Sequence, residues 1–220
     1  MANIENINSI NSIEKNRAPG KLVVISGPAG SGKGTVLKEL FGLAEYKYSV
    51  SATTRSPRNG EADGVDYYFL SQNDFMKMAA NGEMLEYVEY SGNYYGTPRT
   101  PVEKMLDSGY SVILELEVKG AVYIKEKLPQ AVMIFLTPPT YFELEKRLRD
   151  RGTESGETVK RRLEISKKEI ACIDKYDYLV INDNDMQRKA AFEINCIVEA
   201  EKNKTTAAKT KKFLDDYFGN

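Results

Sequence analysis

The pattern of hydrophobic and polar positions predicts strands that alternate with helices. Four short apolar runs, at residues 22–25, 112–116, 132–136 and 178–181, have the length and composition of buried strands. After Lys33, apolar residues recur at helical spacing at Val36, Leu37, Leu40 and Phe41. The alternation predicts an α/β fold in three layers, with a doubly wound parallel sheet flanked by helices.

Two regions interrupt this alternation. Residues 48–97 are crowded with Tyr, Ser, Thr and Gly and contain short β-like pieces such as residues 65–70, which predicts an inserted, small β-rich subdomain. Within it, Ser71 with Asp74 is typical of a capping box that opens a helix through Met78. Residues 147–162 are dense in Arg and carry Gly152 and Gly156, which predicts a mobile helical lid.

The two ends of the chain differ from the rest. Residues 1–20 are rich in Asn, Ile and Ser and end in Ala18-Pro19-Gly20, so we expect a flexible or weakly docked N-terminal arm. Residues 201–220 are Lys-rich and end in a predicted short helix. We therefore expect one folded domain over residues 21–203, with its core in residues 21–47 and 98–203, and a C-terminal extension over residues 204–220.

Composition removes several classes of function. Lys and Arg number 31 against 32 Asp and Glu, so no overall field favours nucleic acid or an anionic membrane. No apolar run is long enough to span a bilayer or resembles a signal peptide, which predicts a cytoplasmic protein. Cys172 and Cys196 lie in apolar segments that read as helical, so buried thiols are expected rather than a disulfide or a metal cluster. The chain has no histidine, which excludes imidazole acid–base chemistry.

A phosphate-binding loop follows the first predicted strand. The sequence Gly27-Pro28-Ala29-Gly30-Ser31-Gly32-Lys33-Gly34-Thr35 matches G-x-x-x-x-G-K between a strand and a helix. Its backbone N–H groups and helix N-terminus would cradle phosphates, while Lys33 reaches the β- and γ-phosphates of a nucleoside triphosphate. Gly34 stands where Ser or Thr usually follows the Lys, so Mg²⁺ would be supported by Thr35, or by the Gly34 backbone and water.

A second set of motifs has groups that suit an acceptor phosphate. Arg55 and Arg58 lie three residues apart between Pro57 and Gly60, and hydroxyls come from Ser51 and Tyr67. Two guanidinium groups with hydroxyl donors could clamp a terminal phosphate. Downstream, E-x-x-E ends at Glu86, and G-x-x-Y-G ends at Gly96 just before Thr97.

These motifs resemble the signature of the guanylate kinase family, in which T-T-R-x-x-R-x-G-E leads to D-Y-x-F and then to E-x-x-E and G-x-x-Y-G. The resemblance implies that Ser51, Glu86 and Thr97 read the guanine of GMP. It also implies that Tyr95 joins Arg55, Arg58 and Tyr67 at the GMP phosphate. A carboxylate accepts hydrogen bonds from N1–H and the 2-amino group of guanine, and adenine lacks this adjacent pair of donors.

The resemblance extends to the second half of the chain. Glu115 and Glu117, expected on one side of a strand end, match positions between the two nucleotides, where the family often has Asp at the second site. The R-G-T-E sequence that begins at Arg151 resembles the family lid, and Asn182 matches a residue near the adenine of ATP. The catalytic set implied in this way is Lys33, Arg55, Arg147, Arg151 and Arg162.

The activity that follows from the resemblance is ATP-dependent phosphorylation of GMP, and of dGMP, with Mg²⁺ accompanying ATP. No general base is needed, because a phosphate monoester with a second pKa of about 6 is mostly dianionic at neutral pH. Two alternatives remain at this point. A non-catalytic module of the same fold would bind proteins through the former GMP pocket, although such modules usually lose the P-loop that is intact here. A related kinase acting on AMP or a ribose phosphate would not need Glu86, Ser51 and Thr97.

Overall fold

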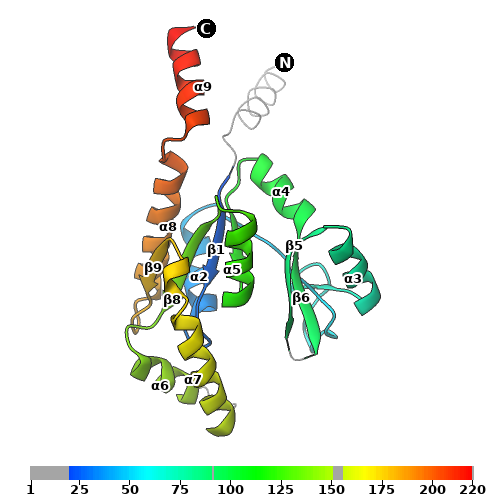
Figure 1. Ribbon diagram of the computed structural model, residues 1–220. Coiled ribbons are helices and arrows are strands. Elements are labelled where there is room, and N and C mark those ends of the chain that lie inside the picture. The colour runs from blue at the N-terminus through cyan, green and yellow to red at the C-terminus, as the bar shows by residue number, and fades with distance from the viewer. Residues whose placement is uncertain (1–19, 91, 151–155, 220) are drawn as a thin grey trace, which may run out of the picture.

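The structure is a computed structural model that describes residues 20–90, 92–150 and 156–219. Within these residues, a parallel sheet forms the centre of the molecule, with strand order β2-β7-β1-β8-β9 (Figure 1). The central strand β1 places Val24 opposite Leu114 on one side and Met133 on the other. The strands are β1 (Leu22–Ser26), β2 (Lys47–Tyr48), β7 (Val112–Glu115), β8 (Val132–Thr137) and β9 (Tyr178–Ile181).

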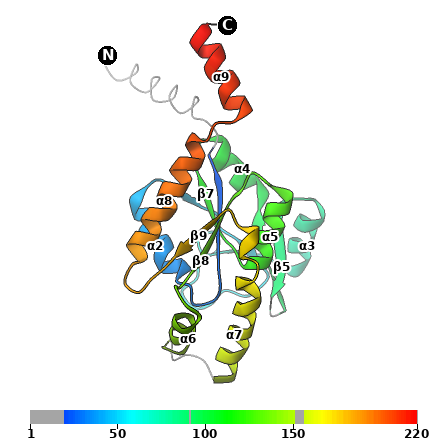
Figure 2. The same ribbon diagram turned by 60° about the vertical axis from the view of Figure 1, so that its left-hand side comes forward.

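Helices cover both faces of this sheet, as Figures 1 and 2 show. Because side chains alternate along a strand, Val23 and Ile25 pack with α2 (Lys33–Leu43) and α8 (Gln187–Asn203). Val24 points the other way and packs with α4 (Arg99–Asp107) and α5 (Val118–Lys127). The α/β class, the parallel sheet and the three layers predicted from the sequence are confirmed.

A second sheet is built by the segment between β2 and α4, with strand order β4-β3-β6-β5. Its elements are β3 (Ala52–Thr53), β4 (Tyr68–Phe69), α3 (Gln72–Ala80), β5 (Met84–Tyr90) and β6 (Asn93–Pro98). Phe75 of α3 is fully buried with Ala52 and Met84, which gives this unit an apolar centre of its own. The fold thus contains the predicted β-rich insert.

Of two local predictions within the insert, the helix cap is confirmed and the length of a strand is wrong. The predicted cap is present, since Ser71 Oγ accepts a hydrogen bond from the backbone N–H of Asp74 at 3.1 Å. The predicted β-like piece at residues 65–70 was too long, because only Tyr68–Phe69 is a strand. Before it the chain turns at Gly64, whose N–H donates to the carbonyl of Tyr67 at 2.8 Å with φ at 73°.

The predicted lid region contains two helices, α6 (Tyr141–Asp150) and α7 (Gly156–Ile170), followed by the 3-10 helix η1 (Ile173–Lys175). They lie together beyond one end of the central sheet (Figure 2). Leu144 and Leu148 of α6 pack against Val159 and Leu163 of α7 in a separate apolar cluster. Residues 151–155 between them, which include Arg151, lie outside the described residues.

The prediction of two buried thiols was wrong. Cys196 is exposed, because the buried stripe of α8 runs through Ala190, Ile194 and Val198, and Cys196 lies on the other side of the helix. Cys172 is partly exposed in the turn that precedes η1. Among the described residues, we find no helix that is both apolar and long enough to cross a bilayer.

The C-terminal region continues past α8 as a separate helix, α9 (Ala207–Phe218), where the sequence predicted a short helix. α9 projects from the end of the molecule opposite α6 and α7 (Figures 1 and 2).

Candidate active site

The loop between β1 and α2 has the conformation expected of a phosphate cradle. Gly30 and Gly32 adopt φ values of 87° and 85°, and α2 begins directly afterwards at Lys33. Lys33 Nζ donates to the carbonyl of Gly27 at 2.7 Å and contacts that of Pro28 at 3.4 Å, so its ammonium group lies over the loop. The Thr35 hydroxyl donates to the carbonyl of Gly32 at 2.8 Å, one turn into the helix.

Asn182 supports this loop from the far end of β9. Its backbone N–H donates to Thr137 at 2.9 Å, and its side-chain Nδ2 donates to the carbonyl of Ser31 at 2.8 Å. A Cβ atom at position 32 would lie 2.3 Å from Asn182 Nδ2, which together with the positive φ explains the glycine. The Asn182 Oδ1 atom is buried and has no hydrogen-bond partner within the described part of the chain. Asn182 therefore fixes the P-loop and keeps one acceptor available beside it.

A cavity of about 400 Å³ joins the P-loop to the insert. Its lining includes the loop residues Gly27, Ala29 and Lys33, the insert residues Ser51, Tyr67, Glu86 and Tyr95, the residues Glu115 and Glu117 after β7, and Arg162 of α7. Residues predicted from widely separated segments thus line one space. A phosphate bound over the loop and a ligand bound against the insert would face each other across it.

Glu86 is the most deeply buried charged group of the cavity, with 4% of its surface exposed. It lies on β5 directly opposite Thr97 on β6, and the Thr97 hydroxyl donates to Glu86 Oε1 at 2.8 Å. Burial raises the pKa of Glu86 to about 7, although hydrogen bonds from Thr97 act in the opposite direction. Ionising this carboxylate is costly while the site is empty. The site is therefore well suited to a ligand that brings its own hydrogen-bond donors.

Arg55 is held in place by Glu61 through a two-point ion pair. The Nη1–Oε2 distance is 2.7 Å and the Nη2–Oε1 distance is 2.9 Å. The guanidinium group also lies over the Tyr67 ring at 5.3 Å. Hydrogen bonds from Arg55, and then from the backbone of Arg58, lower the pKa of Glu61 to about 2, so this carboxylate stays ionised.

The phosphate clamp is only partly assembled. The rings of Tyr67 and Tyr95 meet edge to face with centroids 6.1 Å apart, and both line the cavity. Arg58 is exposed, and the contact that it makes with the clamp is a 2.7 Å hydrogen bond from its backbone N–H to Glu61. Arg55 and Arg58 are not part of the cavity lining in this conformation.

Carboxylates gather at the end of β7. The predicted strand through residue 116 ends one residue early, at Glu115, and Glu117 caps α5 instead of continuing the strand. Both still line the cavity, where they are joined by Glu169 of α7. Burial raises the pKa of Glu115 while the charge of Lys33 lowers it. Burial, and then the charge of Glu117, raise the pKa of Glu169, again opposed by Lys33. The charge of Lys33 therefore acts on two of these carboxylates, Glu115 and Glu169.

The lid arginines occupy different positions. Arg162 lines the cavity, whereas Arg147 points to the loop after β9. Its Nε atom donates to Glu143 at 3.0 Å, and its Nη2 atom donates to the Asn182 carbonyl at 3.0 Å and to Asn184 Oδ1 at 2.8 Å. Arg151 lies outside the described residues.

Sequence reasoning missed several residues of the site. Tyr48, Gly120 and Glu169 line the cavity, and Glu61 holds Arg55, yet none was selected as a site residue. Gly120 lies inside α5, where a Cβ atom would come within 2.9 Å of Glu86 Oε2. A glycine inside a helix is a signal of close approach that was available in the sequence. Tyr48 and Glu169 carried no such signal.

A glycine loop that joins a buried parallel strand to a helix, with its lysine facing a second pocket across a shared cavity, defines the P-loop kinase class of fold. A family model described as "Guanylate kinase" matches residues 19–201. The guanylate kinase of Streptococcus pneumoniae (strain ATCC BAA-255 / R6) is 52% identical over 184 residues, which cover 83% of this chain and 88% of that protein.

The guanylate kinase of Lactococcus lactis subsp. lactis (strain IL1403) is 52% identical over 186 residues, with 84% of this chain and 90% of that protein covered. The crystal structure of guanylate kinase from Anaplasma phagocytophilum is similar with a TM-score of 0.71 and 32% identity, covering 92% of this chain and 97% of that one. The chain therefore belongs to the guanylate kinase family.

Proposed function

We propose that the cavity is the active site in which this chain transfers the γ-phosphoryl group of ATP to GMP. The observation that best supports this proposal is that Lys33 of the P-loop and the buried carboxylate of Glu86 line the same cavity. The family relationship supports the same reaction. We further propose dGMP as an acceptor and a role in purine nucleotide metabolism and GMP recycling in the cytoplasm.

On the donor side, the backbone N–H groups of residues 27–35 would bind the ATP phosphates, with Lys33 at the β- and γ-phosphates. The acceptor atom Asn182 Oδ1, buried beside the loop and without a hydrogen-bond partner among the described residues, suits the amino group of adenine. Gly34 has no side chain to offer, and the hydroxyl that follows it in the chain is that of Thr35, which we propose supports Mg²⁺. Oxygen donors fit this ion, which usually keeps several waters, and it would neutralise charge on the transferred group.

On the acceptor side, Glu86 would accept hydrogen bonds from N1–H and the 2-amino group of guanine. Thr97 orients the carboxylate, and Ser51 lines the same wall of the cavity. Adenine would leave this buried carboxylate unpaired, which makes Glu86 the basis of base selection. Tyr67 and Tyr95, with Arg55 and Arg58, would bind the GMP phosphate.

Catalysis in this proposal consists of positioning and charge stabilisation. An oxygen of the dianionic GMP phosphate attacks the γ-phosphorus while the bond from that phosphorus to the β,γ-bridging oxygen breaks and ADP leaves, and no side chain has to remove a proton. We propose residues 48–97 as the GMP-binding unit and residues 147–162 as the lid. Closure would turn Arg55 and Arg58 onto the acceptor phosphate and bring Arg147 and Arg151 towards the transferred group, where Arg162 already faces the cavity. Glu115 and Glu117 lie between the two nucleotides in this arrangement.

The remaining alternatives are less well supported. A protein-binding module would not need a loop in which Lys33, the glycines and Asn182 are all arranged for phosphate binding. A kinase with another acceptor would have no use for a buried Glu86 whose only described side-chain partner is Thr97.

Two alanine variants test the assignment of donor and acceptor sites. Lys33→Ala should abolish ADP release with saturating GMP, because contacts to the β- and γ-phosphates are lost. Glu86→Ala should mainly raise the KM for GMP and leave the KM for ATP near the wild-type value. A Lys33→Ala enzyme with wild-type kcat, or a Glu86→Ala enzyme with an unchanged KM for GMP, would overturn the corresponding role.

A further inference from the structure

The C-terminal helix α9 carries an apolar stripe that no described part of the chain covers. Apolar side chains follow the spacing i, i+1, i+4 and i+5, at Phe213, Leu214, Tyr217 and Phe218. Their exposed fractions are 60%, 43%, 71% and 67%, and none of the twelve residues of α9, all of them described, is buried. An exposed apolar surface of this kind marks a contact site.

Most of the remaining positions of α9 are charged, so the stripe has a polar border. Charged side chains fill the opposite side of α9, at Lys209, Lys211, Lys212, Asp215 and Asp216. Within the stripe, the rings of Phe213 and Tyr217 stack with centroids 5.5 Å apart, and those of Tyr217 and Phe218 meet edge to face at 5.2 Å. The aromatic rings contact one another and form a continuous surface.

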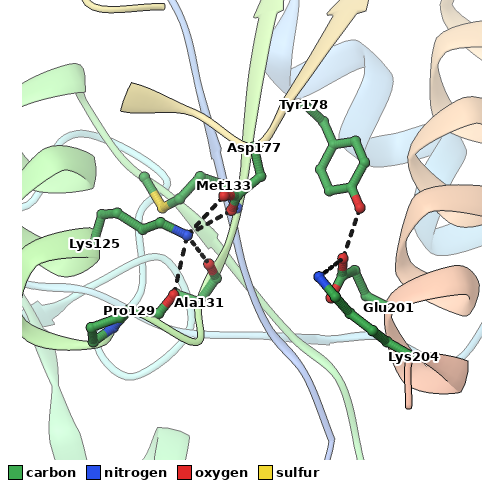
Figure 3. Close-up of polar contacts among 8 residues, drawn as sticks. All are labelled: Lys125, Pro129, Ala131, Met133, Asp177, Tyr178, Glu201 and Lys204. Atoms are coloured by element: carbon green, nitrogen blue, oxygen red, sulfur yellow. Dashed lines mark hydrogen bonds and ion pairs between the residues drawn. The ribbon is translucent and has the colours of Figure 1, made fainter. Parts of the chain in front are cut away.

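The C-terminal end of α8, from which the chain continues into α9, is anchored to the domain. The Tyr178 hydroxyl of β9 donates to Glu201 Oε1 at 2.7 Å, and Lys204 Nζ donates to the same atom at 3.1 Å (Figure 3). Beyond this point, Lys209 Nζ donates to the carbonyl of Lys202 at 3.2 Å. The chain therefore leaves α8 and enters α9 from a fixed position at one end of the central sheet.

The N-terminal arm joins the domain beside this position. The N–H of Gly20 donates to the carbonyl of Leu106 at 2.9 Å, immediately before β1. Partial burial would raise the pKa of Glu201, but hydrogen bonds from Tyr178 and Lys204, and the charges of Lys204 and Lys21, lower it overall. Lys21 is thus close enough to act on the carboxylate that anchors the end of α8. Figures 1 and 2 show the start of β1 and the base of α9 at the same end of the molecule.

The sequence of the arm complements the stripe. Ile4, Ile7, Ile10 and Ile13 recur every third residue, and every position between them is Glu, Asn or Ser. On an α-helix, with about 100° per residue, these four isoleucines would be neighbours spread over one half of the circumference, so residues 4–13 would have one broad apolar side. Asn and Ser are weak helix formers, which means that such a segment needs an apolar surface to pack against.

The lengths of the arm, of its connection to Gly20 and of α9 allow the arm to lie along α9. As helices, residues 4–13 would span about 15 Å and α9 about 18 Å. The six residues 14–19 that connect the arm to Gly20 reach up to about 20 Å when extended, enough to bring it alongside α9. The arm up to residue 18 and all of α9 lie outside the matched family region of residues 19–201, so neither belongs to the shared kinase domain.

We propose that residues 4–13 pack along the apolar stripe of α9 in the same chain, forming a second contact unit outside the kinase domain. The occupant is the arm because it is apolar on one side, leaves the domain next to α9 and is long enough to reach it. A second copy of the chain, or solvent, would be the alternative occupant of the stripe.

The chain contains no tryptophan, so Tyr217→Trp creates a single fluorescent reporter on the stripe. In the full chain we expect blue-shifted emission, protection from acrylamide, and no dependence of either on protein concentration. Adding Ile7→Asp and Ile10→Asp should shift the emission to that of a solvent-exposed indole. The matched control, Asn8→Asp with Ser12→Asp, adds the same charge to the polar side of the same segment and should leave the emission blue-shifted.

Three results would overturn the proposal. The first is solvent-exposed emission from the reporter in the otherwise unchanged chain. The second is blue-shifted emission that Ile7→Asp and Ile10→Asp do not alter. The third is emission that shifts to the blue only as protein concentration rises, which would assign the stripe to a second copy. Deletion of residues 1–13 from the reporter chain provides an independent test, since it should expose the indole in the same way.

Discussion

The Thr97 hydroxyl donates a 2.8 Å hydrogen bond to Oε1 of Glu86, and the two residues face each other across neighbouring strands of the insert. This bond fixes one oxygen of a carboxylate that is 4% exposed and leaves the other oxygen for a ligand. The role in guanine recognition that we propose for Glu86 therefore depends on Thr97, which orients the Glu86 carboxylate.

Removing the hydroxyl at position 97 tests this dependence. Thr97→Val should raise the KM for GMP by roughly 10- to 100-fold, because a hydrogen bond to a charged group contributes about 1.5–3 kcal/mol. The KM for ATP should stay near its wild-type value. Thr97→Ser keeps the hydroxyl and serves as the matched control, so an equal loss in both variants would contradict the role of the hydrogen bond. Steady-state kinetics with GMP and ATP varied separately provides the measurement.

The raised pKa of Glu86 predicts a pH dependence of GMP binding. Burial holds the pKa near 7 in the empty site, and guanine requires the ionised form. Affinity for GMP should therefore fall as pH decreases below about 7, by up to about tenfold for each pH unit. Titrations from about pH 6 to about pH 8 should show a steeper fall in affinity for the wild type than for Glu86→Gln. Ionisation of the GMP phosphate affects both proteins equally, so their affinity ratio isolates Glu86, and a constant ratio would contradict the prediction.

The ion pair between Glu61 and Arg55 predicts a positioning role for Glu61. Glu61→Gln should misplace the Arg55 guanidinium and raise the KM for GMP by roughly 10- to 100-fold, the cost expected when a binding group is poorly positioned. The KM for ATP should change little. Glu103→Gln, which weakens the exposed contact with Arg99, is a matched control and should behave as wild type. A Glu61→Gln enzyme with the kinetics of this control would show that Arg55 needs no such support.

Much of the fold followed from local sequence patterns. Buried parallel strands read as continuous apolar runs, and the P-loop combines such a strand with glycines and a lysine. What could not be predicted depends on contacts between distant segments. The pairing of Glu86 with Thr97 requires the register of β5 and β6, which shifts between Met84 and Glu86. The contacts of Arg147 with Asn182 and Asn184 join parts of the chain about 35 residues apart.

Gly120 offers a test at a position that sequence reasoning missed. Gly120→Ala would place a Cβ atom within 2.9 Å of Glu86 Oε2, so we expect a higher KM for GMP with little change in the KM for ATP. Gly42→Ala is a matched control in α2, where an added Cβ meets nothing within 4 Å. It should keep wild-type kinetics and gain roughly 0.5–1 kcal/mol of stability from the helix propensity of Ala. Kinetics and thermal melting of both variants check this, and equal GMP kinetics would contradict it.

The most direct test of the central claim is ADP release measured with ATP and Mg²⁺ and with GMP, AMP, CMP or UMP as the acceptor. Rapid release with GMP, and little with the other three, is the predicted result. It would establish phosphoryl transfer and guanine selection in one experiment. Comparable release with AMP would contradict the role of Glu86, and ATP binding without release for any acceptor would contradict the proposed activity.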